Sequence, residues 1–201
     1  GGWCPLLLAA LVFIVMTTWK KGRRILNERI QSEARLLEEF LEDMARRPPT
    51  RVPGTAIFMN GNASRTPPAL LHNLEHNKVL HQRVLFLTVK TKQIPFIAQE
   101  DRVEVESLGN GFHRLKVYYG FMEDPDIPKV LNAISVPGFT YDPKDTTYFL
   151  GRETIIASKR PGMARWREKL FSIIAHNATS ATAYFCLPPD RVVEMGEQIE
   201  I

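Results

Sequence analysis

The stretch "FIVMTTWKKGRRIL" (residues 13–26) joins the end of an apolar run to a cluster of basic residues. The run carries no charged side chain between Trp3 and Trp19, and these two tryptophans bracket it. A helix of that length rises about 25 Å, slightly less than the roughly 30 Å hydrocarbon core of a bilayer. Tryptophan is enriched at both interfaces of a membrane. The stretch therefore predicts a transmembrane helix within residues 1–22.

Four bases, Lys20, Lys21, Arg23 and Arg24, follow the apolar run directly. A secretory signal peptide carries its bases before the apolar run, so this order argues against one. A buried core helix is the other alternative, but an abrupt flank of four bases is unusual for such a helix. Positive charge collects on the cytoplasmic side of membrane helices, which places the residues after Lys20 in the cytoplasm.

The net charge of +4 comes from this basic flank. The four bases are 4 of the 26 in the chain, and the remaining 22 balance its 22 acidic residues, none of which precedes Glu28. A neutral body argues against a nucleic-acid-binding face. The two cysteines, Cys4 and Cys186, provide neither a disulfide framework nor a paired metal motif, which is typical of a reducing compartment.

Residues 23–46 have the spacing of an amphipathic helix, with apolar side chains three and four positions apart and acids on the other face. The prolines of "RRPPTRVPG" (residues 46–54) end that pattern. We expect residues 23–50 to form a connector helix and a linker. The helix would pack on the following domain or, alternatively, pair with a second copy of itself.

Residues 51–201 alternate between strand and helix patterns, which predicts a cytosolic α/β domain. Glycines at positions 109 and 111 indicate a hairpin, and the other strands are separated by helices, so the sheet should be mixed but mostly parallel. We expect strands at residues 55–60, 83–91, on both sides of 109–111, at 146–157 and at the chain end, and helices at residues 67–80, 127–135 and 162–179.

The pattern "HNLEH" resembles the inverted zinc-peptidase motif. On a helix, His72 and His76 would lie one turn apart and could share a metal, with Glu75 as the base. Five-residue patterns match often by chance, and no further carboxylate ligand is evident. Zinc hydrolysis with His72, Glu75 and His76 is therefore a remote alternative.

Two further clusters have a structural and a functional interpretation. Glu123, Asp124 and Asp126 could bind a cation, but such a run more often forms a turn in which the last acid caps the next helix. Arg165, Arg167 and Lys169 beside Trp166 could bind an anion. The apolar spacing of Met163, Trp166, Leu170, Ile173 and Ile174 instead favours a helix that faces the core.

The sequence contains no Walker-type or dinucleotide-type glycine loop and no recognisable nucleophile elbow. We therefore expect no enzyme activity, no cofactor and no catalytic, cofactor-binding or metal site in this chain. The residues alone indicate a membrane helix, a connector and an α/β body.

Seven phrases of the chain, in order, resemble the C-terminal end of the Kup-type (KUP/HAK/KT) potassium uptake transporters. They lie at residues 1–26, 51–60, 67–89, 111–131, 148–154, 162–178 and 184–201. The resemblance covers nearly the whole chain and is more specific than any single motif above.

The resemblance implies a multi-pass protein of the cell inner membrane that takes up potassium ions, with protons as the coupling ion. Residues 1–22 would be its last transmembrane helix, in contact with the lipid bilayer, and residues 51–201 its cytosolic domain. That domain would serve assembly, as part of a homodimer, or regulation, with a nucleotide as a candidate ligand. The ion pathway would lie upstream, so no potassium or proton residue is assigned here.

The sequence is also compatible with two other functions, a membrane-anchored cytosolic ligand-binding module and the zinc hydrolase. The chain begins with two glycines rather than methionine, which favours the tail of a longer polypeptide.

Overall fold

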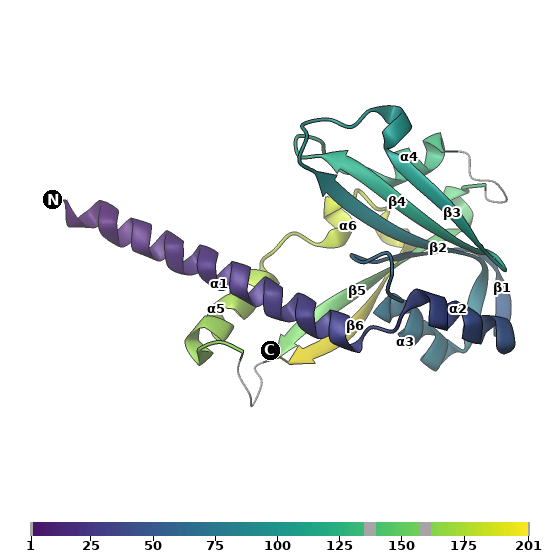
Figure 1. Ribbon diagram of the computed structural model, residues 1–201, viewed down its shortest axis with the longest axis horizontal. Coiled ribbons are helices and arrows are strands. Elements are labelled where there is room, and N and C mark those ends of the chain that lie inside the picture. The colour runs from purple at the N-terminus through teal and green to yellow at the C-terminus, as the bar shows by residue number, and fades with distance from the viewer. Residues whose placement is uncertain (1, 135–139, 157–161, 201) are drawn as a thin grey trace. The chain divides into compact units, whose positions relative to one another are not determined.

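The computed structural model describes residues 2–134, 140–156 and 162–200 (Figure 1). The chain forms two compact units, each built from segments far apart in the sequence. The first unit comprises Gly1–Glu33, Glu153–Thr179 and Gly196–Ile201, and the second comprises Ala34–Arg152 and Ser180–Met195. The predicted division into residues 1–22, 23–50 and 51–201 stays a prediction.

Six strands form one sheet in the order β3-β4-β2-β1-β5-β6 (Figure 1). Their bounds are β1 Thr50–Met59, β2 Val79–Lys92, β3 Val103–Gly109, β4 Phe112–Gly120, β5 Thr146–Ile156 and β6 Val192–Glu200. Strand β1 pairs in parallel with β2 and with β5, and β2 pairs in parallel with β4. Only β3, among the strand pairs with described register, is antiparallel to its neighbour. The predicted α/β class with a mostly parallel mixed sheet is confirmed.

The helices lie where the sequence patterns predict them, but their lengths differ from the predicted lengths. Their bounds are α1 Trp3–Glu33, α2 Leu37–Arg46, α3 Pro68–Asn77, α4 Ile127–Ala133, α5 Arg165–His176 and α6 Ala181–Tyr184. Helix α3 ends three residues earlier than the expected 67–80, because Lys78 adopts a left-handed conformation and the chain then enters β2. The short α6 was not expected.

The hairpin at residues 109–111 is confirmed. Strands β3 and β4 pair around Gly109, Asn110 and Gly111, and all three have positive φ values, of 80°, 50° and 78°. A Cβ at Gly111 would overlap the backbone carbonyl oxygen of Gln82. Glycine is therefore required there for space as well as for backbone conformation.

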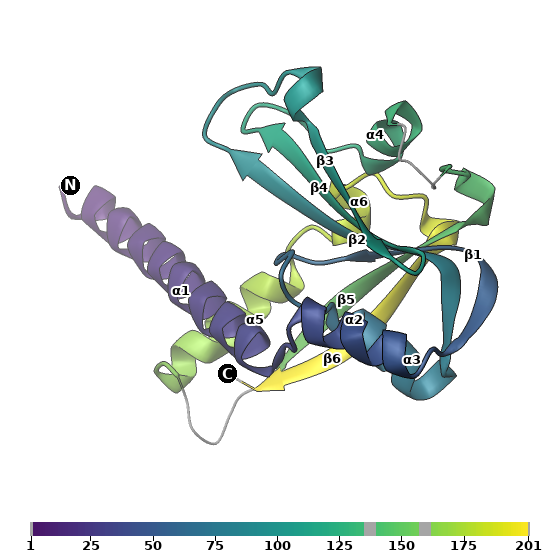
Figure 2. The same cartoon turned by 45° about the vertical axis from the view of Figure 1, so that its right-hand side comes forward.

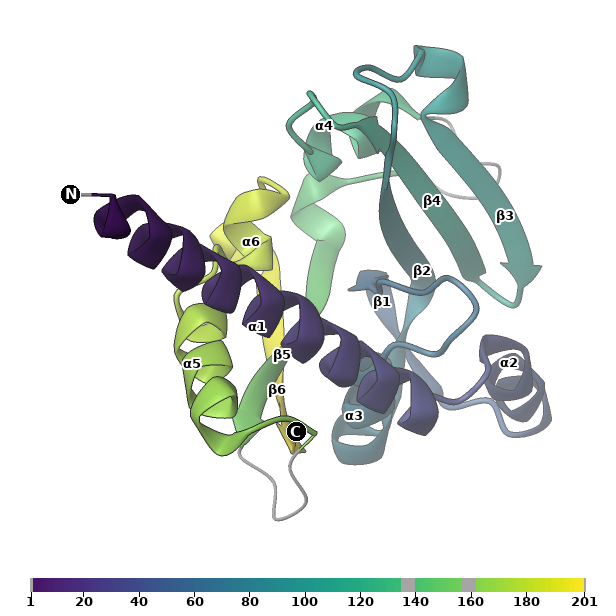
Figure 3. The ribbon, with the colours of Figure 1, turned by 60° about the vertical axis from the view of Figure 1, so that its left-hand side comes forward.

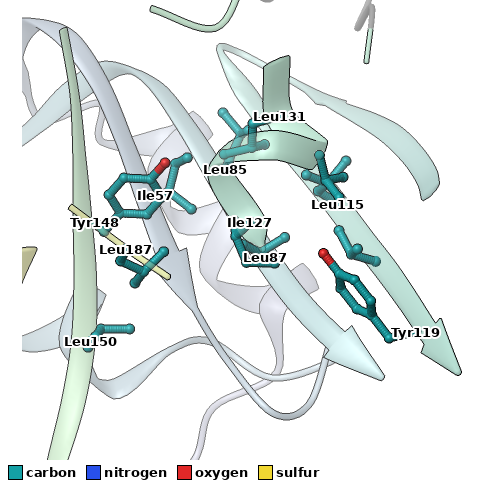
Figure 4. Close-up of a cluster of buried hydrophobic side chains, with 12 residues drawn as sticks. Ile57, Leu85, Leu87, Leu115, Tyr119, Ile127, Leu131, Tyr148, Leu150 and Leu187 are labelled. Carbon is teal, nitrogen blue, oxygen red and sulfur yellow. The ribbon is translucent and has the colours of Figure 1, made fainter. Parts of the chain in front are cut away.

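One face of the sheet is covered by α4 and by the segment after α6 (Figure 4). Ile127 and Leu131 of α4 contact Leu85, Leu87 and Leu115 of the central strands in one buried cluster. Alternate residues of a strand point to opposite faces, so the side chains between these belong to the other face. Tyr148 and Leu187 complete this cluster, and their side chains appear beside Ile57 in Figure 4.

The opposite face is covered by α2 and α3, which lie side by side in Figures 1 and 2. Leu37 and Phe40 of α2 and Leu70 of α3 are buried against Phe58 and Phe86 of the sheet. With both faces covered, the central strands β1 and β2 have continuous buried runs rather than an alternating pattern. The burial of these apolar side chains on both faces of the sheet stabilises the second unit.

Strand β1 begins earlier than predicted. Thr50, Arg51 and Val52 already pair with β2, and the register shifts between Val52 and Thr55. The shift accommodates Pro53, which has no N–H to donate, and Gly54, whose φ is 102°. The expected linker is thus partly a bulged strand.

The connector helix predicted for residues 23–46 is interrupted. Residues up to Glu33 continue α1, residues 34–36 are not helical, and α2 starts at Leu37. The intervening backbone bonds to another segment: the N–H of Thr66 donates to the carbonyl of Arg35 at 2.9 Å, and that of Leu37 donates to Ser64 at 3.1 Å. Helical periodicity could not reveal these partners, which lie about 30 residues away.

Candidate functional site

The amino-terminal half of α1 exposes an unbroken set of large apolar side chains. Among the described residues, one helix is long and apolar enough to cross a membrane, over Trp3–Ile30. Only 6% of its apolar window is buried within the described chain, whereas the core helix of a soluble protein is mostly buried. The exposed side chains are Trp3, Leu6, Leu7, Leu8, Leu11, Val12, Phe13, Ile14 and Met16.

The polar boundary of α1 falls within one helical turn. Thr17 and Thr18 follow the apolar residues, and the Thr17 hydroxyl donates to the carbonyl of Phe13 at 2.7 Å, so it is satisfied without water. Beyond it, the Arg23 guanidinium lies 5.8 Å from the centre of the Trp19 ring. An aromatic side chain next to bases is the arrangement expected at a membrane interface.

Helix α5 packs on α1 at this boundary. The Phe171 ring is fully buried and lies 5.5 Å from the Trp19 ring, centre to centre. Gly22 lets the ring approach, because a Cβ there would overlap it. Leu26 and Ile199 close the same apolar cluster.

Arg167 of α5 adds a polar contact to this packing. Its guanidinium donates to the hydroxyl of Thr18 at 2.9 Å and to that of Thr17 at 3.2 Å. Thr18 is fully buried. The contact joins residues 149 positions apart in the chain, so no local pattern could have predicted it.

The prediction that the apolar stripe of α5 faces the core is wrong for two of its members. Met163 is buried, but Trp166 is 55% exposed and Ile173 is 62% exposed. The buried face of α5 instead holds Phe171 and the carboxyl group of Glu168. Periodicity identifies an apolar stripe, but it does not say whether that stripe meets the core or another apolar phase.

The zinc-peptidase pattern does not form a metal site in this structure. His72 is half-buried, Glu75 and His76 are exposed, and the two imidazole rings lie 6.2 Å apart, edge to face. Within residues 2–134, 140–156 and 162–200, no three His, Cys, Asp or Glu side chains gather closely enough to hold a metal ion. Burial lowers the pKa of nearby His81, which packs on the Phe149 ring.

The acidic run at residues 123–126 has structural roles. Asp126 accepts the N–H of Lys129 at 2.9 Å, which confirms the predicted helix cap. Glu123 forms an ion pair with Arg102 at 2.5 Å, with both side chains only 15% exposed. The Arg102 hydrogen bond, together with the backbone N–H groups of Gly120 and Ile97, holds the pKa of the Glu123 carboxyl below its usual range.

The sequence did not reveal the long-range ion pairs of the second unit. Arg83 of β2 bonds to Asp145 at 2.9 Å and to the Thr55 hydroxyl at 2.9 Å, across separations of 62 and 28 residues. The bond to Thr55 joins the neighbouring strands β2 and β1, whereas Asp145 directly precedes β5 on the other side of β1, so Arg83 links three segments of the sheet.

Comparison with known proteins gives one family. The sequence profile described as "K+ potassium transporter C-terminal domain" matches residues 53–201. The chain is 54% identical over 201 residues to the "Probable potassium transport system protein Kup" of Myxococcus xanthus, covering 100% of this chain and 31% of that protein. It is 50% identical over 201 residues to the protein of the same name from Azoarcus sp., covering 100% and 32% respectively.

The chain spans about a third of the length of these curated relatives, 31% and 32%. No solved structure matches it. Both relatives are named as potassium transport proteins, and the match extends over α1 and α5 as well as over the second unit.

Proposed function

Because the chain belongs to the K+ potassium transporter C-terminal domain family, we propose that it is the last part of a protein that carries potassium ions across the cell inner membrane. One observation supports this most directly. The chain joins an exposed apolar helix with a basic end to a domain of that family. An isolated folded body would not keep nine large apolar side chains of one helix in water, as the run from Trp3 to Met16 would require.

In this proposal the apolar part of α1 is the last membrane crossing. The boundary lies at Thr17–Trp19, where the exposed apolar residues end and the bases begin. Positive charge near a crossing favours the cytoplasmic side, so the rest of the chain would lie in the cytoplasm.

The orientation is tested with the native thiol of Cys186, which is free and exposed. In the complete transporter with all other cysteines replaced, a membrane-impermeant maleimide should leave intact spheroplasts unlabelled and label them after permeabilisation. The variant Cys186→Ser is the control and should stay unlabelled in both. Labelling of intact spheroplasts would place the body outside and overturn the proposed orientation.

The ion pathway itself is proposed to lie elsewhere in the longer protein. Between Trp3 and Trp19 the only ionisable side chain is the thiol of Cys4, whereas intramembrane ion and proton paths use carboxylates or other polar groups. Proton coupling rests on the family resemblance alone. The helix α1 would then be a peripheral support of the transporter.

For the second unit we propose assembly or regulation of the transporter, with a homodimer and a nucleotide ligand as the specific forms to test. A ligand can regulate only if it binds two arrangements with different affinity. A continuous helix from α1 through α2 would transmit such a change directly, but the helix is interrupted at residues 34–36. A change of arrangement in the second unit would instead reach α1 through the backbone hydrogen bonds that residues 35 and 37 make with residues 64–66.

A further inference from the structure

Helix α5 exposes two large apolar side chains and buries its one acidic side chain, although Phe171 of the same helix is fully buried. Trp166, Leu170 and Ile173 are four and three positions apart and form a stripe along one face. Trp166 and Ile173 are 55% and 62% exposed, and Leu170 is half-buried. The carboxyl-bearing Glu168 is only 3% exposed. An apolar face turned outward indicates a second apolar phase beside it.

The start of α5 lies at the same level as the polar boundary of α1. Arg167 bonds to Thr17 and Thr18, the residues at which the apolar run of α1 ends. The Arg167 guanidinium lies 6.0 Å from the centre of the Trp166 ring. Trp166 is thereby fixed next to the boundary, where tryptophan is enriched in membrane proteins.

Helix α5 also crosses α1 rather than running along it, as Figures 1 and 3 show. If α1 crosses the bilayer, a helix that crosses α1 at its boundary lies near the plane of the membrane surface. Amphipathic helices in that plane bury apolar side chains about 5–10 Å into the boundary between headgroups and acyl chains.

The charges around the stripe are basic. Arg165 and Lys169 of α5 are exposed, and so are Lys20, Arg23 and Arg24 of α1. Among these, Arg24 has an acidic partner, Glu28, at 3.7 Å. Bases beside an exposed tryptophan complement the anionic lipids of the cytoplasmic leaflet, which attract each nearby Lys or Arg.

We propose that α5 is an interfacial helix, with Trp166, Leu170 and Ile173 inserted among lipids and Arg165 and Lys169 bound to anionic lipid headgroups. The inference rests on the proposed membrane crossing of α1. It adds a second membrane contact to that crossing, made by a helix whose Arg167 lies 149 positions after Thr18 of α1. The contact continues the exposed apolar surface of α1, which favours lipid over a separate protein partner.

The test uses the complete transporter in vesicles of phosphatidylglycerol and phosphatidylcholine, with its native cysteines replaced. A fluorescent label is attached after Ile173→Cys, with reference labels after Leu8→Cys in α1 and Phe121→Cys in the second unit, where Phe121 is 61% exposed. Lipids with a nitroxide on the headgroup or on the acyl chain quench nearby labels. We expect headgroup nitroxides to quench position 173 at least about threefold more than position 121.

Two variants separate lipid contact from simple exposure. Trp166→Ala should reduce quenching at position 173, whereas Tyr184→Ala, which removes an aromatic ring that is 51% exposed in the second unit, should not. The double variant Arg165→Gln and Lys169→Gln should reduce quenching in vesicles that contain phosphatidylglycerol. It should have little effect in pure phosphatidylcholine, where no anionic headgroup is present.

The outcomes distinguish this inference from the proposed function. If acyl-chain nitroxides quench position 8 but no nitroxide quenches position 173, the interfacial helix is wrong and the crossing of α1 stands. If position 8 is not quenched, the proposed membrane crossing fails as well. A label at position 173 that is shielded from water but not quenched by lipid would show that protein covers the stripe, which also overturns the inference.

Discussion

Arg102 and Glu123 show what a single pair of residues contributes to the second unit. Their oxygen and nitrogen lie 2.5 Å apart, and the Arg102 guanidinium also donates to the carbonyl of Ile97 at 2.9 Å. The Glu123 carboxylate in turn accepts the N–H of Gly120 at 2.7 Å. Each charge therefore satisfies backbone groups of the turns around β4 in addition to its partner, so the pair fixes those turns.

The first prediction concerns the loss of this carboxylate. Glu123→Gln leaves the shielded Arg102 without its counter-charge and should lower the free energy of unfolding by about 2 kcal/mol near neutral pH. The pKa of Glu123 is below its usual value in the folded protein. Its stabilising effect is therefore complete above the unfolded-state pKa and is lost as the pH falls through the folded-state pKa.

Chemical unfolding of the wild type and of Glu123→Gln at several pH values measures this effect. The difference between the two proteins should shrink as the pH falls through the lowered pKa of the folded-state Glu123 carboxyl. Glu106→Gln is the matched control, since Glu106 pairs with Arg114 at 2.8 Å but is 56% exposed, and it should change stability much less. A constant difference at all pH values would contradict the assigned ion pair.

At the scale of elements, two adjacent leucines at the start of α2 differ in their surroundings. Leu37 is fully buried in the cluster with Phe58 and Leu70, whereas Leu36 is 40% exposed and precedes the helix. Leu36 forms an isolated antiparallel bridge with Arg65 through its backbone. The side chain of Leu37 therefore attaches α2 to the sheet, and the backbone of Leu36 attaches the break to the loop before α3.

We therefore predict that Leu37→Ala lowers the free energy of unfolding by about 3 kcal/mol, through lost apolar burial and a residual cavity. Leu36→Ala is matched in chemistry and position and should cost less than about 1 kcal/mol, because its backbone bridge remains. Chemical unfolding measures both values, and hydrogen exchange of the α2 amides should increase only for Leu37→Ala. Equal losses in the two variants would show that α2 is not held by this side chain.

At the scale of the whole molecule, the proposed membrane crossing and the proposed regulation belong to two different units of the chain. The first unit contains the apolar helix α1 with α5, and the second contains most of the sheet with α2, α3 and α4. Both units draw on distant segments, so a truncation at one point removes parts of each. The proposed roles of crossing and of regulation therefore have to be separated in the complete transporter.

The prediction at this scale is that the transporter cut after Glu33 still reaches the membrane but loses regulation. Rubidium uptake per transporter, measured in cells without other potassium uptake systems, should differ severalfold from that of the uncut protein. Abundance in the membrane fraction is the necessary control. Unchanged uptake at normal abundance would leave the body without a regulatory role. The variant Leu37→Ala, which destabilises the second unit without removing α5, should change uptake in the same direction.

The sequence by itself determined the features that depend on neighbours along the chain. The apolar run before Lys20, the hairpin at Gly109–Gly111 and the cap of α4 by Asp126 are local, because helix length, backbone conformation and capping involve residues a few positions apart. The alternation of strand and helix patterns likewise predicted the mostly parallel sheet.

Only the tertiary structure decided the features that depend on distant partners. The backbone of residues 64–66 bonds to Arg35 and Leu37 at the break between α1 and α2, although the periodicity continues through the break. Arg167 meets Thr18, and the stripe of Trp166 faces outward, although its spacing is that of a core helix. Periodicity records that a helix has an apolar face. Whether that face meets the protein core or lies outside it depends on packing between segments that are far apart in the sequence.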